Sequence, residues 1–126
     1  MKHANSTPSA PAALGPYSQG IDAGPFVFVS GQLPVDPATG EIPDGATAQA
    51  ERAFANVRAI LAAAGVGPEH VVKTTVFLSD LADSAAVNEV YARSFSAPFP
   101  ARSCVQVAAL PRGAHLEVEV IAVRPS

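Results

Sequence analysis

The chain has 126 residues, of which 48% are hydrophobic and only 15% charged, and its formal net charge is −3 at pH 7. This length fits one compact domain and the composition excludes an intrinsically disordered chain, while eight scattered Lys and Arg residues offer no basic patch for nucleic acid. Because so few charges cannot cover the surface of so small a domain, we expect part of its apolar surface to face another copy of the chain.

The single cysteine, Cys104, excludes an intrachain disulfide and predicts a reducing compartment. The N-terminal stretch lacks the apolar core of a signal peptide, and no apolar run approaches the length of a transmembrane helix. We therefore expect a cytoplasmic protein that binds neither membrane nor nucleic acid.

The N-terminal third is predicted to contain two short strands after an extended segment. Residues 1–14 are rich in Ser, Pro and Ala and are expected to form an extended start of one domain spanning residues 1–126. Two β runs follow, Tyr17–Gly24 and Pro25–Leu33. Turn residues fill Pro34–Gly45, which predicts a loop or a short hairpin.

Two helices are predicted in the middle of the chain. Apolar residues recur at helical spacing over Thr47–Ala64, and Gly65 follows as an expected C-terminal stop. A second helix is expected to run from a cap at Asp80 or Asp83 to about Phe95.

Three later strands are predicted, at His70–Asp80, Phe99–Pro111 and His115–Val123, so that two helices cover one face of a sheet in an α+β domain. We expect one sheet face to be apolar and to lie under both helices. The other face is expected to be mixed in character, as in a subunit interface that contains a polar site. Its predicted members are Lys73, Thr75, Phe77, Arg102, Cys104, Gln106, Glu117, Glu119, Ile121 and Val123.

Six stretches of the sequence together carry a family resemblance. In chain order they are "GPYSQG", "VSGQLPVDPATGE", "VVKTTVFLSDL", "VNEVY", "FPARSCVQVAALP" and "LEVEVIAV". In this order they resemble the reactive intermediate deaminase family (RidA, also called YjgF) over nearly the whole chain. The resemblance implies a chorismate-mutase-like fold with a mixed sheet, a homotrimer with sites between chains, and a 2-iminobutanoate/2-iminopropanoate deaminase. Such an enzyme hydrolyses 2-imino and enamine acids to 2-keto acids and ammonia.

Matching the family by position implies a set of site residues. Arg102 and Glu117 are predicted to be catalytic, and the substrate-binding residues are predicted to be Arg102, Tyr17, Ser30, Cys104 and Asn88. A guanidinium suits the substrate carboxylate, since it binds with two parallel hydrogen bonds. A partly buried carboxyl suits the placing of water and the transfer of a proton. The chain departs from the family in a shorter Tyr91–Arg102 stretch and in Gln106, where Glu is common.

Plainer interpretations stay open for these residues. Arg102 could form a structural salt bridge between subunits, and Glu117 could face solvent. Tyr17 and Ser30 could be ordinary turn and strand-end residues. Asn88 suits a supporting role better than direct contact with substrate. No His or Asp is placed to activate the thiol of Cys104, which is expected to contribute backbone groups.

Rival functions also stay open. The first alternative is a non-catalytic protein that binds 2-keto acids, and the second is a ribonuclease or translation inhibitor, which the acidic balance disfavours. Three scattered histidines give no metal-ligand spacing, so no metal or cofactor is expected.

One geometric prediction concerns the distance between the two principal residues. Arg102 and Glu117 each begin a strand, and the resemblance implies that these two strands are antiparallel and separated by the His70–Asp80 strand. The two residues are then predicted to lie at opposite ends of the sheet, about 16–20 Å apart. If both serve one small substrate, they must then come from different chains.

Overall fold

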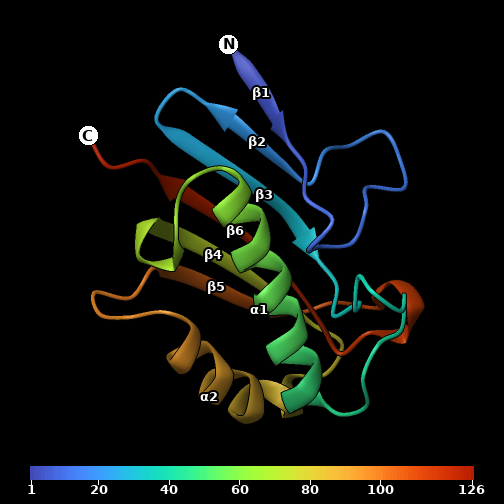
Figure 1. The fold of residues 1–126 in the computed structure, drawn as a ribbon. Helices are drawn as coiled ribbons and strands as arrows, with labels where there is room; N and C mark the ends of the chain where they lie inside the picture. The colour runs from blue at the N-terminus through green and yellow to red at the C-terminus, as the bar shows by residue number, and fades with distance from the viewer.

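A computed structural model describes residues Met1–Ser126 as one mixed sheet with two helices on a single face (Figure 1). The six strands lie in the order β1-β2-β3-β6-β4-β5. The strands are β1 (Lys2–Asn5), β2 (Gly20–Ala23), β3 (Phe26–Gln32), β4 (Val71–Leu78), β5 (Ala101–Gln106) and β6 (Leu116–Val123). The helices are α1 (Ala46–Ala63) and α2 (Ser84–Ser94), with short 3₁₀ turns η1 (Pro68–His70), η2 (Leu81–Asp83) and η3 (Pro111–Gly113). Neither helix is long and apolar enough to cross a bilayer.

The single parallel pair of the sheet determines where α2 lies. Strand β5 runs parallel to β4, whereas every other neighbouring pair is antiparallel. Parallel neighbours cannot be joined by a tight turn, so the chain needs a crossover, and α2 supplies it between β4 and β5. This connection brings the residues of α2 to the β5 edge of the sheet, as Figure 1 shows.

The core lies between the helices and the central strands. Helix α1 buries one stripe against the sheet, with Ala50, Phe54, Val57 and Leu61 at most 1% exposed. Gly20 on β2 allows this close approach, because a Cβ added there would lie 2.8 Å from a methyl carbon of Ile60. Each fully buried Leu, Val or Phe of this layer contributes about 1.5–3 kcal/mol through removal of apolar area from water.

An aromatic cluster joins the two helices. The ring of Phe54 on α1 packs edge-on against Tyr91 of α2 and against Phe95, with both centroid distances 5.8 Å. Tyr91 and Phe95 also contact each other, at 4.8 Å between centroids. Aromatic pairs of this geometry add about 0.5–1.5 kcal/mol beyond the area they bury, which fixes α2 firmly against α1.

Most of the predicted helices and strands agree with the structure to within about three residues at their ends. Two runs are exceptions. In the Phe99–Pro111 run β5 already ends at Gln106, and in the Tyr17–Gly24 run β2 begins only at Gly20. The α+β class and the placement of both helices on one face are confirmed. Strand β1, within the predicted extended segment, was not predicted, and it pairs antiparallel with β2.

One predicted face assignment is wrong. Arg102, Cys104 and Gln106 pair in parallel register with Thr74, Val76 and Leu78, whose side chains are buried under the helices. Side chains of paired residues share a face, so these three residues point to the helix side and not to the mixed face. All six residues of β5 are exposed, because this edge strand lies at the rim of the helical layer.

The face of the sheet away from the helices has no helix over it and is mixed in character, because Lys73, Thr75, Glu117 and Glu119 lie there among apolar side chains. Phe26 and Phe28 of β3 and Val105 of β5 remain 43–44% exposed there. Half-buried Phe77 and Ile121 lie between them on β4 and β6. We call this surface the open face.

Candidate functional site

Glu117 lies on β6, the strand between β3 and β4, and its side chain points to the open face. It pairs with Phe77 across β4 and lies beside Gly31 of β3. A Cβ added to Gly31 would lie only 2.8 Å from the carboxyl carbon of Glu117. The absence of a side chain at position 31 therefore provides the space that the carboxyl group occupies.

The surroundings of Glu117 favour its neutral form. Burial raises the pKa of this carboxyl above its ordinary value, and the nearby charge of Glu119 raises it further. A carboxyl group with a raised pKa can hold and release a proton closer to neutral pH than an exposed one.

A cavity of about 610 Å³ opens beside Glu117, and two further predicted residues line it. Tyr17 is 56% exposed at its rim. The hydroxyl group of Ser30 donates a hydrogen bond of 2.5 Å to the carbonyl oxygen of Ser18, so its oxygen remains free to accept one. The cavity also contains Glu119 and one cation, Arg112, whose φ of 58° is in the left-handed region.

One buried glutamine holds the irregular wall of this cavity. Gln19 is 4% exposed, and its amide nitrogen donates to the carbonyl oxygens of Thr7, Ala10 and Pro11 at 2.7–3.2 Å. Its amide oxygen accepts from the backbone N–H of Thr7 at 2.7 Å. These bonds hold the N-terminal segment in place, and its continuation, which includes Leu14, lines the cavity.

Arg102 and Asn88 form a second group, at the β5 edge. Nη1 of Arg102 donates to the side-chain oxygen of Asn88 at 2.7 Å. The guanidinium carbon lies 4.7 Å from the centroid of the Tyr91 ring, within the range of a cation–π contact. These three residues, with Phe99 and Pro100, line a cavity of about 470 Å³. The guanidinium forms no ion pair with any carboxylate of its own chain.

Arg102 and Glu117 are separated within one chain, but the cause of the separation differs from the one that the sequence predicts. Arg102 pairs with Thr74 and Glu117 with Phe77, so they differ by only three residues along β4, about 10 Å. Adding two strand spacings places their Cα atoms about 14 Å apart, less than the predicted distance. The main separation comes from the sheet itself, because Arg102 points to the helix side and Glu117 to the open face.

Cys104 lies two residues beyond Arg102, on the helix side of β5. Its thiol is exposed and lines neither of the two cavities. No cluster of three or more His, Cys, Asp or Glu side chains converges anywhere in the structure.

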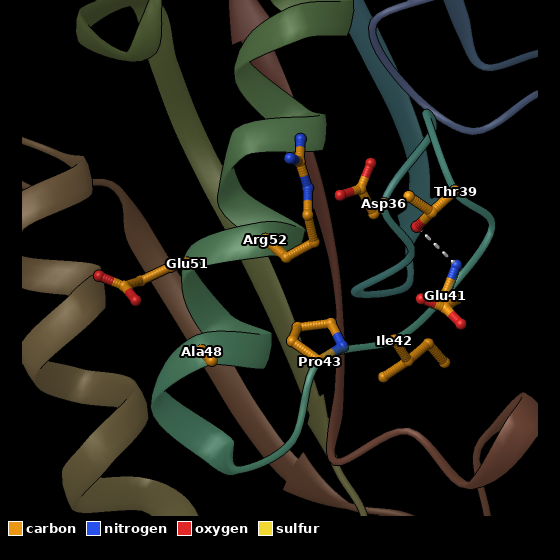
Figure 2. A pocket seen from close by; sticks show the side chains of 8 residues that line it. All are labelled: Asp36, Thr39, Glu41, Ile42, Pro43, Ala48, Glu51 and Arg52. Atoms are coloured by element: carbon orange, nitrogen blue, oxygen red, sulfur yellow. Dashed lines mark hydrogen bonds between the residues drawn. The ribbon is translucent and has the colours of Figure 1, made fainter.

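A further cavity of about 450 Å³ lies between the Asp36–Pro43 loop and the start of α1, and Figure 2 shows its lining. Arg52 and Asp36 face the same space, whereas Glu51 points away and pairs with Arg93 at 3.4 Å. Nη2 of Arg52 is bonded to buried Asn56 at 2.8 Å, and its Nε is buried without a partner. Since Nη2, which belongs to both paired-donor edges of the guanidinium, already donates to Asn56, we assign no site here.

Two residues important to the site geometry were missed by the sequence analysis. Gly31 was not predicted because a close approach between strands depends on register. Tyr91 was not singled out as a site residue, although its spacing of three from Asn88 already places the two side chains on one helix face.

Comparison with known proteins gives consistent matches over the whole chain. Residues 7–124 match the family described as endoribonuclease L-PSP. The 2-iminobutanoate/2-iminopropanoate deaminase of Escherichia coli K12 is 51% identical, and the match covers 98% of this chain and 99% of that protein. The crystal structure of E. coli TdcF with bound serine is 48% identical and superposes with a TM-score of 0.93, over 98% of this chain and 99% of that one. RidA from the Antarctic bacterium Psychrobacter sp. PAMC 21119 is 49% identical, with a TM-score of 0.93 over 96% and 98% of the two chains.

Proposed function

Because this chain belongs to the endoribonuclease L-PSP family, which includes the reactive intermediate deaminases, we propose that it hydrolyses small 2-imino acids and their enamine tautomers. The expected substrates are 2-iminobutanoate and 2-iminopropanoate, and the products are the 2-keto acid and ammonia. The observation that carries the proposal is a half-buried carboxyl with a raised pKa, in a chain that also presents an arginine free of any carboxylate partner.

Arg102 binds the substrate carboxylate. Its guanidinium keeps its charge at any physiological pH, and only one of its donors is used, by Asn88. The remaining N–H groups can form the paired hydrogen bonds that a carboxylate accepts. This contact fixes the imine carbon relative to the rest of the site.

Glu117 handles the proton transfers. As a carboxylate it accepts a proton from a water molecule, whose oxygen attacks the imine carbon to form a carbinolamine. As a carboxylic acid it donates that proton to the imine nitrogen, which completes the carbinolamine. The carboxylate then accepts the proton of the carbinolamine hydroxyl group and passes it to the same nitrogen, so that ammonia leaves as the carbonyl forms. One water molecule is consumed, and the carboxyl group returns to its starting state. A raised pKa suits both steps, because the two protonation states are then closer in population near neutral pH.

The substrate lies between chains, so that Arg102 of one copy meets Glu117 of the next in a homotrimer. Two features support this arrangement. The sheet separates the two side chains within one copy, and the open face exposes Phe26, Phe28 and Val105, which a second copy would cover. A cytoplasmic location remains a prediction from the single cysteine.

The non-catalytic alternative shares Arg102 but leaves the pKa shift of Glu117 without a use. A 2-keto acid sensor needs a cation for the carboxylate and has no need of a group that transfers protons. The ribonuclease alternative receives little support, because the Glu117 cavity contains two glutamates against one arginine and would repel phosphates.

The test follows the appearance of 2-ketobutanoate from 2-iminobutanoate generated in place by excess threonine dehydratase. We expect the wild-type protein to accelerate this step and both Arg102→Ala and Glu117→Gln to abolish the acceleration. Glu117→Gln should still bind 2-ketobutanoate in calorimetry, whereas Arg102→Ala should not. Unchanged turnover in Arg102→Ala would refute the mechanism, and no acceleration by wild type would favour the binding protein.

Mixing the two inactive variants tests the shared site. Co-refolded at equal amounts, they should recover roughly a quarter of the wild-type sites, because a quarter of the neighbouring pairs combine an intact arginine with an intact glutamate. A mixture as inactive as its components would show that both residues serve one site within the same chain.

A further inference from the structure

We propose that Tyr91 is a positioning residue that holds the Arg102 guanidinium flat and ready for the substrate carboxylate. This inference rests on the proposed function in assigning Arg102 to the substrate. It concerns a residue that is 6% exposed and contributes no polar atom to the substrate itself.

The Tyr91 ring is anchored on two sides. Its hydroxyl group shares a 2.8 Å hydrogen bond with the buried hydroxyl of Thr74, which lies on β4 directly opposite Arg102. Its ring packs against Phe54 and Phe95 at centroid distances of 5.8 and 4.8 Å. The ring therefore cannot turn or shift without breaking a buried hydrogen bond and an aromatic cluster.

Arg102 needs such a support because of where it lies. It is an exposed residue on an edge strand, and a free arginine side chain there would sample many rotamers. The Tyr91 face lies 4.7 Å below the guanidinium, and the Asn88 oxygen holds one of its nitrogens at 2.7 Å. The face of the Tyr91 ring fixes the plane of the guanidinium, and the Asn88 oxygen fixes its rotation within that plane. Because both are in place before the substrate arrives, the entropic cost of binding is lower.

Both supports are neutral, and this matters for the chemistry. A carboxylate partner would hold Arg102 as firmly but would compete with the substrate carboxylate for its charge. The face of an aromatic ring and an amide oxygen attract the cation without neutralising it. The structure thus orients the guanidinium and keeps its positive charge available.

The test compares variants that keep the ring with one that removes it. Tyr91→Leu loses the face and Tyr91→Phe keeps it. Ile60→Ala truncates a fully buried side chain of α1 that packs toward Gly20 on β2, at the other end of the sheet from Arg102 on β5. We expect Tyr91→Leu to raise KM for the imino acid and Kd for 2-ketobutanoate about five-fold or more, with kcat changed less. Tyr91→Phe should remain within about two-fold of wild type in both constants.

The Ile60→Ala control separates positioning from general stability. It should lose unfolding free energy as Tyr91→Leu does, yet keep its Kd for 2-ketobutanoate. A Kd raised equally in Ile60→Ala and Tyr91→Leu would overturn the inference, as would an unchanged Kd in Tyr91→Leu. Since Kd is measured without turnover, this outcome is distinct from a failure of the proposed deaminase reaction, which would appear as an inactive wild-type protein.

A second measurement needs no folded variant. In the wild-type protein, side-chain protons of Arg102 should show an upfield ring-current shift in NMR spectra, because the guanidinium lies over the Tyr91 face. Absence of that shift in the wild-type protein would also overturn the inference.

Discussion

Gly31→Ala moves the carboxyl of Glu117 without changing any charge. The added Cβ would lie 2.8 Å from the carboxyl carbon and 3.1 Å from both Cγ and one carboxyl oxygen, where ordinary contacts begin at 3.4 Å. The carboxyl carbon must therefore retreat by at least about 0.6 Å from its present position. The backbone at position 31 is not in the left-handed region, so alanine adds bulk without backbone strain.

The expected cost falls on the chemical step. Misplacing a reacting group by about 1 Å can reduce turnover about 100-fold, so a retreat of this size is expected to lower kcat about 10- to 100-fold. Binding of 2-ketobutanoate should change little, because the Arg102 guanidinium that binds its carboxylate comes from the neighbouring copy, and its supports, Asn88 and Tyr91, are not altered by the substitution. Overpacking should also lower the unfolding free energy by about 1–3 kcal/mol, which denaturant titration measures.

Gly67→Ala is the matched control for this experiment. It places an added methyl group against the exposed side chain of Glu69, which can rotate into solvent, far from either cavity. We expect it to retain wild-type kcat and stability. A Gly31→Ala protein with wild-type kcat for 2-iminobutanoate would refute the assignment of Glu117 to the reaction geometry.

Three further outcomes are expected. Glu117→Gln should have a higher free energy of unfolding than wild type at pH 7–8 and lose that advantage toward pH 4. The reason is that a carboxyl group with a raised pKa in the folded state makes the wild-type protein less stable as pH rises. A difference in unfolding free energy that is the same at pH 4 and at pH 7–8 in denaturant titration contradicts this. Asn56→Leu should lose about 2–4 kcal/mol of unfolding free energy, since the carbonyls of Leu33 and Val35 lose their donor; a loss under about 1 kcal/mol contradicts it. Asn88→Ala should raise KM about five-fold with kcat preserved, and a collapse of kcat alone would speak against its supporting role.

The elements of this fold could be predicted because most of them bury one face. Helix α1 and strand β6 alternate clearly between buried and exposed positions, so their periodicity in the sequence is unambiguous. The same reasoning predicted Glu117 on the open face correctly, since Leu116 and Val118 on either side of it are fully buried. Local pattern suffices where one face of an element meets the core.

Strand β5 shows where that reasoning stops. The alternation of side chains along β5 places Arg102 and Val105 on opposite faces of the sheet but does not say which face lies under the helices. Burial gives no guide either, because all six residues of β5 are exposed. The apolar Val105 points to the open face and the charged Arg102 to the flank of α2, the reverse of the usual arrangement. Only the parallel pairing with β4 and the crossover through α2 determine this, and both are long-range features that no local window contains.

The Gln19 amide, with its bonds to residues 7–11, has a consequence for how this architecture can diversify. Glu117 is part of the rigid sheet, whereas the wall opposite it is irregular chain fastened chiefly through a single side chain. Exchanges at Pro11, Ala12 or Leu14 can therefore reshape the space available to a substrate side chain while the reacting group keeps its place. We expect substitutions in this N-terminal segment to change the substrate preference without changing the hydrophobic core.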